Sequence, residues 1–184
     1  MKILHDETVY DGKFIKTLRR HYRDAKGEGK VWEMVERKTK GRIVGIAAIT
    51  PKLEIVLEKS FRIPIKSYVL ELPAGLPDRE GETEEELAQR ELLEETGYGV
   101  DEVKFLIGGC ISAGIITDEL ALYLGINARK VKEPELEPSE DIEVIKVPVN
   151  KLPEYLLETI NKGEIKVDVK IITVLPFLEK YKLC

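Results

Sequence analysis

Hydrophobic and polar positions along this chain form short runs that predict strands, and helical spacing follows in a few segments. Short apolar or alternating runs bounded by Gly, Pro or charged residues are typical of β-strands. Such runs occupy residues 9–14, with a turn inside them, and residues 31–37, 43–49, 53–57, 69–72, 104–111, 120–126 and 142–147. Helical spacing predicts amphipathic helices at residues 152–161 and 169–181. Strands and helices that follow no regular βαβ order favour an α+β fold.

The first 42 residues form a segment that is rich in charge and in strand signals. Asp11 and Gly12 predict a tight turn between two strands, and residues 26–29 predict a second turn before the alternating strand at 31–37. We therefore expect two parts: an N-terminal antiparallel β arm, residues 1–42, and a main domain, residues 43–184.

A further helix is predicted between Thr83 and Gly97. Thr83 followed three residues later by Glu86 is typical of a capping box, in which each side chain satisfies a backbone N–H at the start of a helix. Gly97 is a natural C-terminal stop, because glycine adopts the left-handed conformation that closes many helices.

This helix carries a row of carboxylates. Glu91 and Glu95 are four residues apart and therefore about 40° apart around the helix axis. Glu94 and Glu84 fall on the same broad face, and Glu82 lies just before the first turn. Like charges at this spacing repel, and the helix has a single basic residue to offset them. An acidic solvent-exposed face is one interpretation; a site for hard divalent cations, which prefer oxygen ligands, is the one we favour.

From Gly75 to Tyr98 the chain resembles the Nudix box, Gly-x5-Glu-x7-Arg-Glu-U-x-Glu-Glu-x-Gly-U, where U is aliphatic or aromatic. Every fixed position after the first glycine is present: Glu82, Arg90, Glu91, Glu94, Glu95 and Gly97, with Leu92 and Tyr98 at the U positions. One departure precedes the helix, because Gly75 lies seven positions before Glu82 where the family has six. An insertion in a loop costs little and leaves the spacing on the helix unchanged.

The resemblance extends to one branch of the family, the ADP-ribose and nucleotide-sugar pyrophosphatases. Residues 61–64, 70–75, 139–144 and 163–168 are similar to the corresponding segments of that branch. The resemblance implies the Nudix fold, a mixed β-sheet sandwiched between helices, with an N-terminal β-strand arm. In that branch the arm exchanges with a second subunit, so we expect a homodimer.

The resemblance also implies a metal site and a set of residues around it. Mg²⁺ is the expected ion, with Mn²⁺ as the alternative. The expected metal-binding residues are Ala74, through its backbone carbonyl, with Glu82, Glu91 and Glu95. Glu94 is expected nearby in the catalytic set, and Arg90 is expected to hold a neighbouring glutamate in place through its fork of donors.

The general base has more than one candidate. In similar proteins a glutamate on a late, mobile loop approaches the attacking water, and Glu140 matches that position. Its loop, residues 133–141, is rich in Pro and Glu, which is consistent with a lid and also with an exposed acidic linker. Glu119, which we otherwise group with the substrate-binding residues, is the competing candidate, and Asp141 could substitute.

Substrate-binding residues are proposed from weaker signals. Trp32, the only tryptophan, resembles the arm aromatic that stacks on the nucleobase in dimeric relatives, although a lone Trp is also commonly a core residue. Arg62 could contact phosphate or be an exposed residue at a strand end. Many ADP-ribose-specific relatives have proline where this chain has Ala113, so the preferred base and sugar stay open.

Together these features predict metal-dependent hydrolysis of the pyrophosphate bond of a nucleoside diphosphate linked to a sugar, either ADP-ribose or a nucleotide sugar. The products would be a nucleoside monophosphate and a sugar phosphate. The alternatives are a pyrophosphatase of free nucleotides or dinucleoside polyphosphates, and a non-catalytic ligand-sensing module.

Composition limits the kinds of binding partner, metal and cellular location that are expected for this chain. The net charge of -5 argues against a nucleic-acid-binding surface. Residues 1–10 are charged and predict no signal peptide, and the longest apolar stretch, residues 43–49, is too short to span a membrane. Two cysteines form no disulfide framework, and with two histidines they make zinc a poor candidate. Cys110 is expected to be buried and Cys184 to fray; a cytoplasmic location is expected.

Overall fold

The computed structural model describes residues 1–183. Its strands are β1 Lys2–Asp11, β2 Ile15–Arg23, β3 Gly29–Arg37, β4 Ile43–Ile49, β5 Glu54–Arg62, β6 Ser67–Glu71, β7 Ala74–Gly75, β8 Tyr98–Gly99, β9 Glu102–Cys110, β10 Glu119–Ile126, β11 Arg129–Lys130, β12 Ile142–Pro148 and β13 Lys166–Val167. Its helices are η1 Ile63–Ile65, α1 Glu84–Glu91, η2 Leu92–Thr96, η3 Val149–Lys151, α2 Leu152–Lys162 and α3 Lys170–Lys180. Each predicted strand and helix has a counterpart, and most ends agree within a few residues. The exceptions are β1 and β2, which extend far beyond the short strands expected at residues 9–14, and β5, which continues to Arg62 instead of ending at residue 57. The short strands β7, β8, β11 and β13 were not predicted.

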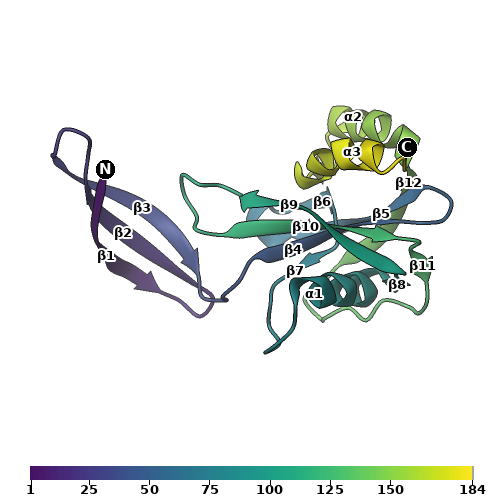
Figure 1. The fold of residues 1–184 in the computed structure, drawn as a ribbon, viewed down its shortest axis with the longest axis horizontal. Coiled ribbons are helices and arrows are strands. Elements are labelled where there is room, and N and C mark those ends of the chain that lie inside the picture. Colours follow the sequence, from purple (N-terminus) through teal and green to yellow (C-terminus); the bar gives the residue numbers. More distant parts are fainter. Residues whose placement is uncertain (184) are drawn as a thin grey trace.

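The main sheet has the strand order β13-β6-β5-β4-β10-β9, with β12 paired to β5 and β7 paired to β4. The β10–β4 and β13–β6 pairs are parallel and the others are antiparallel. Helix α1 covers one face, and α2 and α3 cover the other (Figure 1). This arrangement confirms the predicted α+β class and the mixed sheet between helices.

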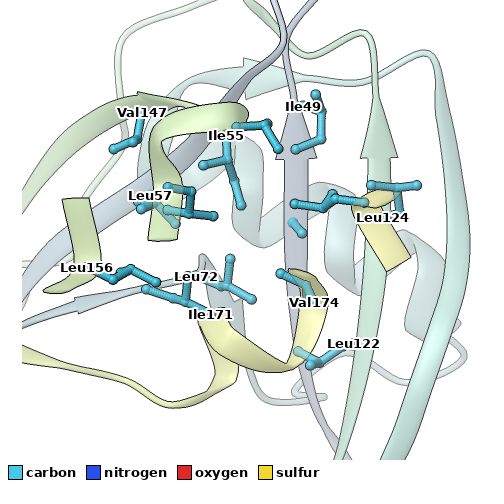
Figure 2. Close-up of a cluster of buried hydrophobic side chains, with 14 of the residues drawn as sticks. Ile49, Ile55, Leu57, Leu72, Leu122, Leu124, Val147, Leu156, Ile171 and Val174 are labelled. Carbon is cyan, nitrogen blue, oxygen red and sulfur yellow. The ribbon is translucent and has the colours of Figure 1, made fainter. Parts of the chain in front are cut away.

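Residues 55–57 of β5 are buried on both faces of the sheet, which is why they form a continuous apolar run rather than an alternating pattern. Ile55 and Leu57 point to the face covered by α2 and α3, where they share a core with Leu156, Ile171 and Val174 (Figure 2). Even-numbered positions of β5 point to the opposite face, toward α1.

The second core lies under helix α1. Val56 of β5 packs there with Leu87 and Leu92 of the helix and with Tyr123 of β10. This contact fixes the rotation of α1 on the sheet, because the apolar side of the helix faces inward. The carboxylate side is left to face the edge of that core.

The N-terminal arm is a separate three-stranded antiparallel sheet, β1-β2-β3, that projects from the main domain (Figure 1). It is attached through the loop between β9 and β10. The Val35 N–H donates to the Ile115 carbonyl at 2.8 Å, and the Trp32 Nε1–H donates to the Gly114 carbonyl at 2.8 Å. The expected division at residue 42 falls between β3 and β4.

Two expectations about single residues are wrong. Cys110 is exposed rather than buried, because it ends β9, the edge strand of the main sheet. The core interpretation of Trp32 also fails, since 52% of this residue is exposed on the arm. The expectation for Cys184 falls outside the described residues. Within residues 1–183, no helix combines the length and the apolar character needed to cross a membrane.

Candidate active site

Helix α1 begins and ends as its sequence predicts. The Thr83 hydroxyl accepts from the Glu86 N–H at 3.2 Å, and the Glu86 carboxylate accepts from the Thr83 N–H at 2.8 Å. After Glu91 the helix widens into one π-helical turn, η2, which Gly97 closes in the left-handed conformation with φ of 74°. The segment from Thr83 to Gly97 therefore forms one continuous helical stretch that carries the carboxylates.

Strand β7 lies directly against this helical stretch. The Ala74 N–H donates to Glu95 Oε2 at 3.1 Å. A Cβ placed on Gly75 would be 2.0 Å from the carboxyl carbon of Glu91, so only glycine permits this approach. The first glycine of the box thus sets the distance between strand β7 and the helix.

Arg90 ties several carboxylates together. Its side chain is only 11% exposed, and its Nε and Nη2 donate to the two carboxylate oxygens of Glu82 at 2.7 and 3.0 Å. Its Nη1 lies 2.9 Å from an oxygen of Glu94 and 2.9 Å from an oxygen of Glu91. These carboxylates raise the pKa of Arg90. Arg90 makes the contacts required of a positioning residue.

The extra residue in the loop before the helix is accommodated without moving the box. The loop folds back over the helix, where Asp78 accepts from Arg90 Nη2 at 2.7 Å. Arg79 Nη2 donates to Glu94 at 2.9 Å. Glu94 is therefore held between two arginines.

Glu84 was expected on the same broad face as the other carboxylates of the helix, but its side chain has different neighbours. Its carboxylate accepts from Arg42 at 2.8 and 2.5 Å and from the Tyr123 hydroxyl at 2.8 Å. Arg42, and less strongly Tyr123, lower its pKa. Glu84 anchors the helix to the sheet and does not belong to the carboxylate cluster.

The two innermost carboxylates of the helix are destabilised in their charged form. Burial raises the pKa of Glu91 to about 7, with Arg90 opposing the shift and Glu94 adding to it. Burial likewise raises the pKa of Glu95 to about 8, with Glu91 adding to the shift. A nearby cation would relieve both penalties, because an opposite charge favours the ionised carboxylate.

The residues present fit a hard divalent cation. The donors at this place are carboxylate and backbone carbonyl oxygens, which Mg²⁺ and Mn²⁺ prefer. A buried carboxylate oxygen of Glu58 also lacks a hydrogen-bond partner within the described chain. In residues 1–183 no three His, Cys, Asp or Glu side chains already stand close enough to hold an ion, so side-chain adjustment would accompany binding.

A cavity of about 1110 Å³ opens over the carboxylates. It is slightly larger than the usual small-molecule site, which has a volume of about 300–1,000 Å³. Of the residues expected in the site, those that line it are Arg62, Ala74, Arg90, Glu91, Glu94, Glu95 and Glu140. Glu82, Trp32 and Glu119 do not line it.

The NUDIX domain family matches residues 39–167. The chain belongs to this family. Its predicted membership is therefore confirmed, and the NUDIX match spans the main domain from just before β4 to β13.

Two curated relatives of this NUDIX chain have names that state an activity. The chain is 31% identical to the ADP-sugar pyrophosphatase of Mus musculus, over 92% of this chain and 83% of that protein. It is 31% identical to the ADP-ribose pyrophosphatase of Saccharomyces cerevisiae, over 91% of this chain and 78% of that protein. A solved structure described as an ADP compounds hydrolase superposes with a TM-score of 0.71 at 24% identity, covering 83% of this chain and 82% of that chain, which shows a shared fold.

The three candidates for the base lie in different surroundings in this NUDIX domain. Glu140 lines the cavity, and its carboxylate accepts from the Glu137 N–H at 2.8 Å. Asp141 accepts from the Tyr68 hydroxyl at 2.5 Å and does not line the cavity. Glu119 starts β10 and lines a separate depression together with Asp118. Of the three, only Glu140 shares the cavity with Glu91 and Glu95.

The cavity also contains residues that sequence reasoning missed. They are Phe14 and Arg37 from the arm, Arg79 from the loop before α1, and Lys166 and Lys170 near the C-terminus. Arg79 occupies a variable position of the box, and the other four lie far from the box in sequence, so the box pattern points to none of them. The one available signal was the basic residue that ends the alternating strand at 31–37.

Proposed function

We propose that this protein hydrolyses the pyrophosphate bond of a nucleoside diphosphate sugar, ADP-ribose or a nucleotide sugar, to a nucleoside monophosphate and a sugar phosphate. The observation that carries the proposal is the cavity in which the box carboxylates Glu91 and Glu95 face arginine and lysine side chains. Buried carboxylates suit cations, and the basic side chains suit the phosphates of the substrate. Relatives named ADP-sugar and ADP-ribose pyrophosphatase support the same substrate class.

Glu91, Glu95 and the carbonyl of Ala74 would hold the divalent cation, Mg²⁺ or alternatively Mn²⁺. When bound, the cation neutralises phosphate charge and lowers the pKa of bound water. Glu82 acts through Arg90: both of its oxygens are engaged by the guanidinium, which in turn holds Glu91 and Glu94.

Glu140 takes the proton from the attacking water. It belongs to the loop between β11 and β12, which is fastened to the helix where the Glu135 N–H donates to the Glu94 carbonyl at 2.7 Å. A base on a loop that lines the cavity can approach the water without disturbing the carboxylates on the helix.

Arg62 binds substrate phosphate. Its Nε donates to Glu71 at 2.7 Å, which fixes the plane of the guanidinium, and about half of the side chain is exposed toward the cavity. A planar guanidinium held by one edge can present its remaining N–H groups to phosphate oxygens.

The protein acts as a homodimer formed through the arm. Phe14 on the rim of the cavity is 67% exposed, and Trp32 is half-exposed on the arm yet outside the cavity of its own chain. Trp32 could therefore stack on a nucleobase only in the cavity of a second subunit. A three-stranded sheet with apolar side chains exposed along it also favours burial against a partner.

The substrate class is tested by a Mg²⁺-dependent screen of ADP-ribose, nucleotide sugars, free nucleotides and dinucleoside polyphosphates, with the products identified. We expect a nucleoside monophosphate and a sugar phosphate from the nucleoside diphosphate sugars. Turnover restricted to free nucleotides or dinucleoside polyphosphates would refute this substrate class, and no turnover with ligand binding would favour a sensing module. The same screen identifies the preferred nucleobase and sugar, which the sequence leaves open, and the cytoplasmic location stays a prediction from sequence.

The identity of the base is tested by two matched substitutions. Glu140→Gln should lower kcat by about 10²–10⁴-fold, the usual contribution of general acid–base catalysis, with little change in KM. Glu119→Gln serves as the control and should cost much less. The reverse order of effects would move the base to Glu119.

A further inference from the structure

Glu58 is a buried carboxylate that the Nudix box does not account for. It lies in the middle of β5 and is 1% exposed. Like Val56, it points to the face of the sheet covered by α1. Its oxygen Oε1 has no hydrogen-bond partner within the described chain. An ionisable group in the interior of a strand is costly unless something compensates it.

The neighbours of Glu58 increase this cost. On β12 its direct partner is Val144, and on β6 its direct partner is Glu71, which is 3% exposed. Like charges directly opposite one another destabilise a sheet. The Glu95 carboxyl from η2 is a second close acidic neighbour of Glu58. Burial, with these two carboxylates, raises the pKa of Glu58 well above its usual range.

No basic side chain of the described residues hydrogen-bonds this oxygen, although the charge of Arg62 partly opposes the rise in the pKa of Glu58. Arg62 pairs with Glu71 at 2.7 Å, and Arg90 pairs with Glu82, Glu91 and Glu94. Glu58 and Glu95 therefore face each other without an intervening side-chain cation in the described residues. Two buried carboxylates that approach in this way are expected where a cation is to be bound between them.

We propose that Glu58 is a direct ligand of a divalent cation at the floor of the cavity, which it binds together with Glu95. Glu71 and Glu95 line the cavity, while Glu58 lies behind them on the sheet. This places one ligand on a central strand and the other on the helix, so the cation would also fasten the end of α1 to β5. The inference rests on the proposed function for Glu95 and adds a ligand that no position of the box supplies.

The test measures Mn²⁺ binding to the full chain by calorimetry and by the electron paramagnetic resonance signal of free Mn²⁺. Glu58→Gln keeps the shape and removes the charge, and should weaken Mn²⁺ binding at least about tenfold. Glu54→Gln is the control, because it makes the same change on the same face of β5 but at the start of the strand, and it should leave Mn²⁺ binding unchanged. Glu58→Val, which suits a buried strand, should raise the metal-free Tm and also weaken Mn²⁺ binding.

Glu95→Gln separates this inference from the proposed function. If the wild-type protein binds no Mn²⁺, or if Glu95→Gln binds it normally, the metal site of the proposed function fails. If Glu95→Gln loses Mn²⁺ and Glu58→Gln retains wild-type affinity, only the assignment of Glu58 is overturned. Should Glu58→Gln fail to fold, a crystal of the wild-type protein with Mn²⁺ decides: an anomalous peak about 2.0–2.6 Å from Glu58 supports the proposal, and a coordination sphere without Glu58 refutes it.

Discussion

Replacing Gly75 by alanine should damage catalysis while leaving the fold nearly intact. The new Cβ would lie 2.0 Å from the carboxyl carbon of Glu91 and 2.1 Å from its Oε1, whereas ordinary contacts begin at 3.4 Å. The carboxylate must therefore move by at least 1.4 Å, the difference between 3.4 and 2.0 Å. The displaced atoms are the end of a flexible side chain, so the backbone can stay in place.

The expected loss follows from that displacement. A misplacement of about 1 Å in a catalytic arrangement can cost about 10²-fold in rate, which is equivalent to about 2.7 kcal/mol in the barrier. Gly75 does not have a left-handed backbone, so alanine adds no dihedral strain. We expect kcat at saturating Mg²⁺ to fall about 10²-fold and Tm to change by no more than about 4 °C, equivalent to about 1 kcal/mol.

The assay combines initial rates of ADP-ribose hydrolysis across a Mg²⁺ series with thermal melts of the same samples. Gly109→Ala, in strand β9, is the matched control, because its Cβ would meet nothing within 4 Å. Wild-type kcat and Mg²⁺ dependence in Gly75→Ala would show that the position of Glu91 is not important for the reaction. A large drop in Tm together with the loss of activity would show that Gly75 acts mainly on the fold.

Three further predictions follow from the geometry of the site and the arm. Glu95→Gln should lower the rate by the equivalent of about 3–5 kcal/mol in the barrier, because it weakens cation binding and transition-state stabilisation. The same variant should have an unchanged or higher Tm without metal. Normal rates with a much lower Tm would instead show that Glu95 is structural. Trp32→Ala should raise KM by about 10–100-fold and leave kcat within a few-fold, because stacking stabilises the bound substrate and the transition state equally. Tm should change little, because the side chain is half-exposed. An unchanged KM would exclude stacking. The pKa values of Glu91 and Glu95, raised to about 7 and about 8, mean that the folded form binds their protons more tightly than the unfolded form does. Their contribution to stability is therefore present below the unfolded pKa of 4.5 and is lost as pH rises through 7 and 8. The metal-free Tm should fall between pH 5 and pH 8, and Mg²⁺ should make this fall in Tm smaller. A metal-free Tm that rises over this range would contradict the assignment.

The carboxylate helix could be predicted because its determinants are local. The capping box of Thr83 and Glu86, the stop at Gly97 and the four-residue spacing of Glu91 and Glu95 depend on contacts within one or two helical turns. The same holds for most of the strands, although β1, β2 and β5 extend well beyond the apolar runs that predicted them. The mixed sheet between helices followed from the order of these elements and from the resemblance to the family.

The composition of the cavity could not be predicted, because contacts between distant segments decide it. Phe14 and Arg37 reach the cavity only through the way the arm is attached, and Glu82 leaves it because Arg90 engages both of its oxygens. Cys110 is exposed only because β9 is the edge of the sheet.

The surroundings of Glu58 show the same limit most clearly. The sequence places it just after the strand predicted at residues 53–57 and gives no sign that it is buried. The register of β5 against β6 puts it opposite Glu71, and the docking of α1 brings Glu95 to it. Local sequence determines the period of a helix or strand and therefore which residues share a face. Strand register and helix packing determine which side chains each carboxylate contacts across the core, and both depend on the whole chain.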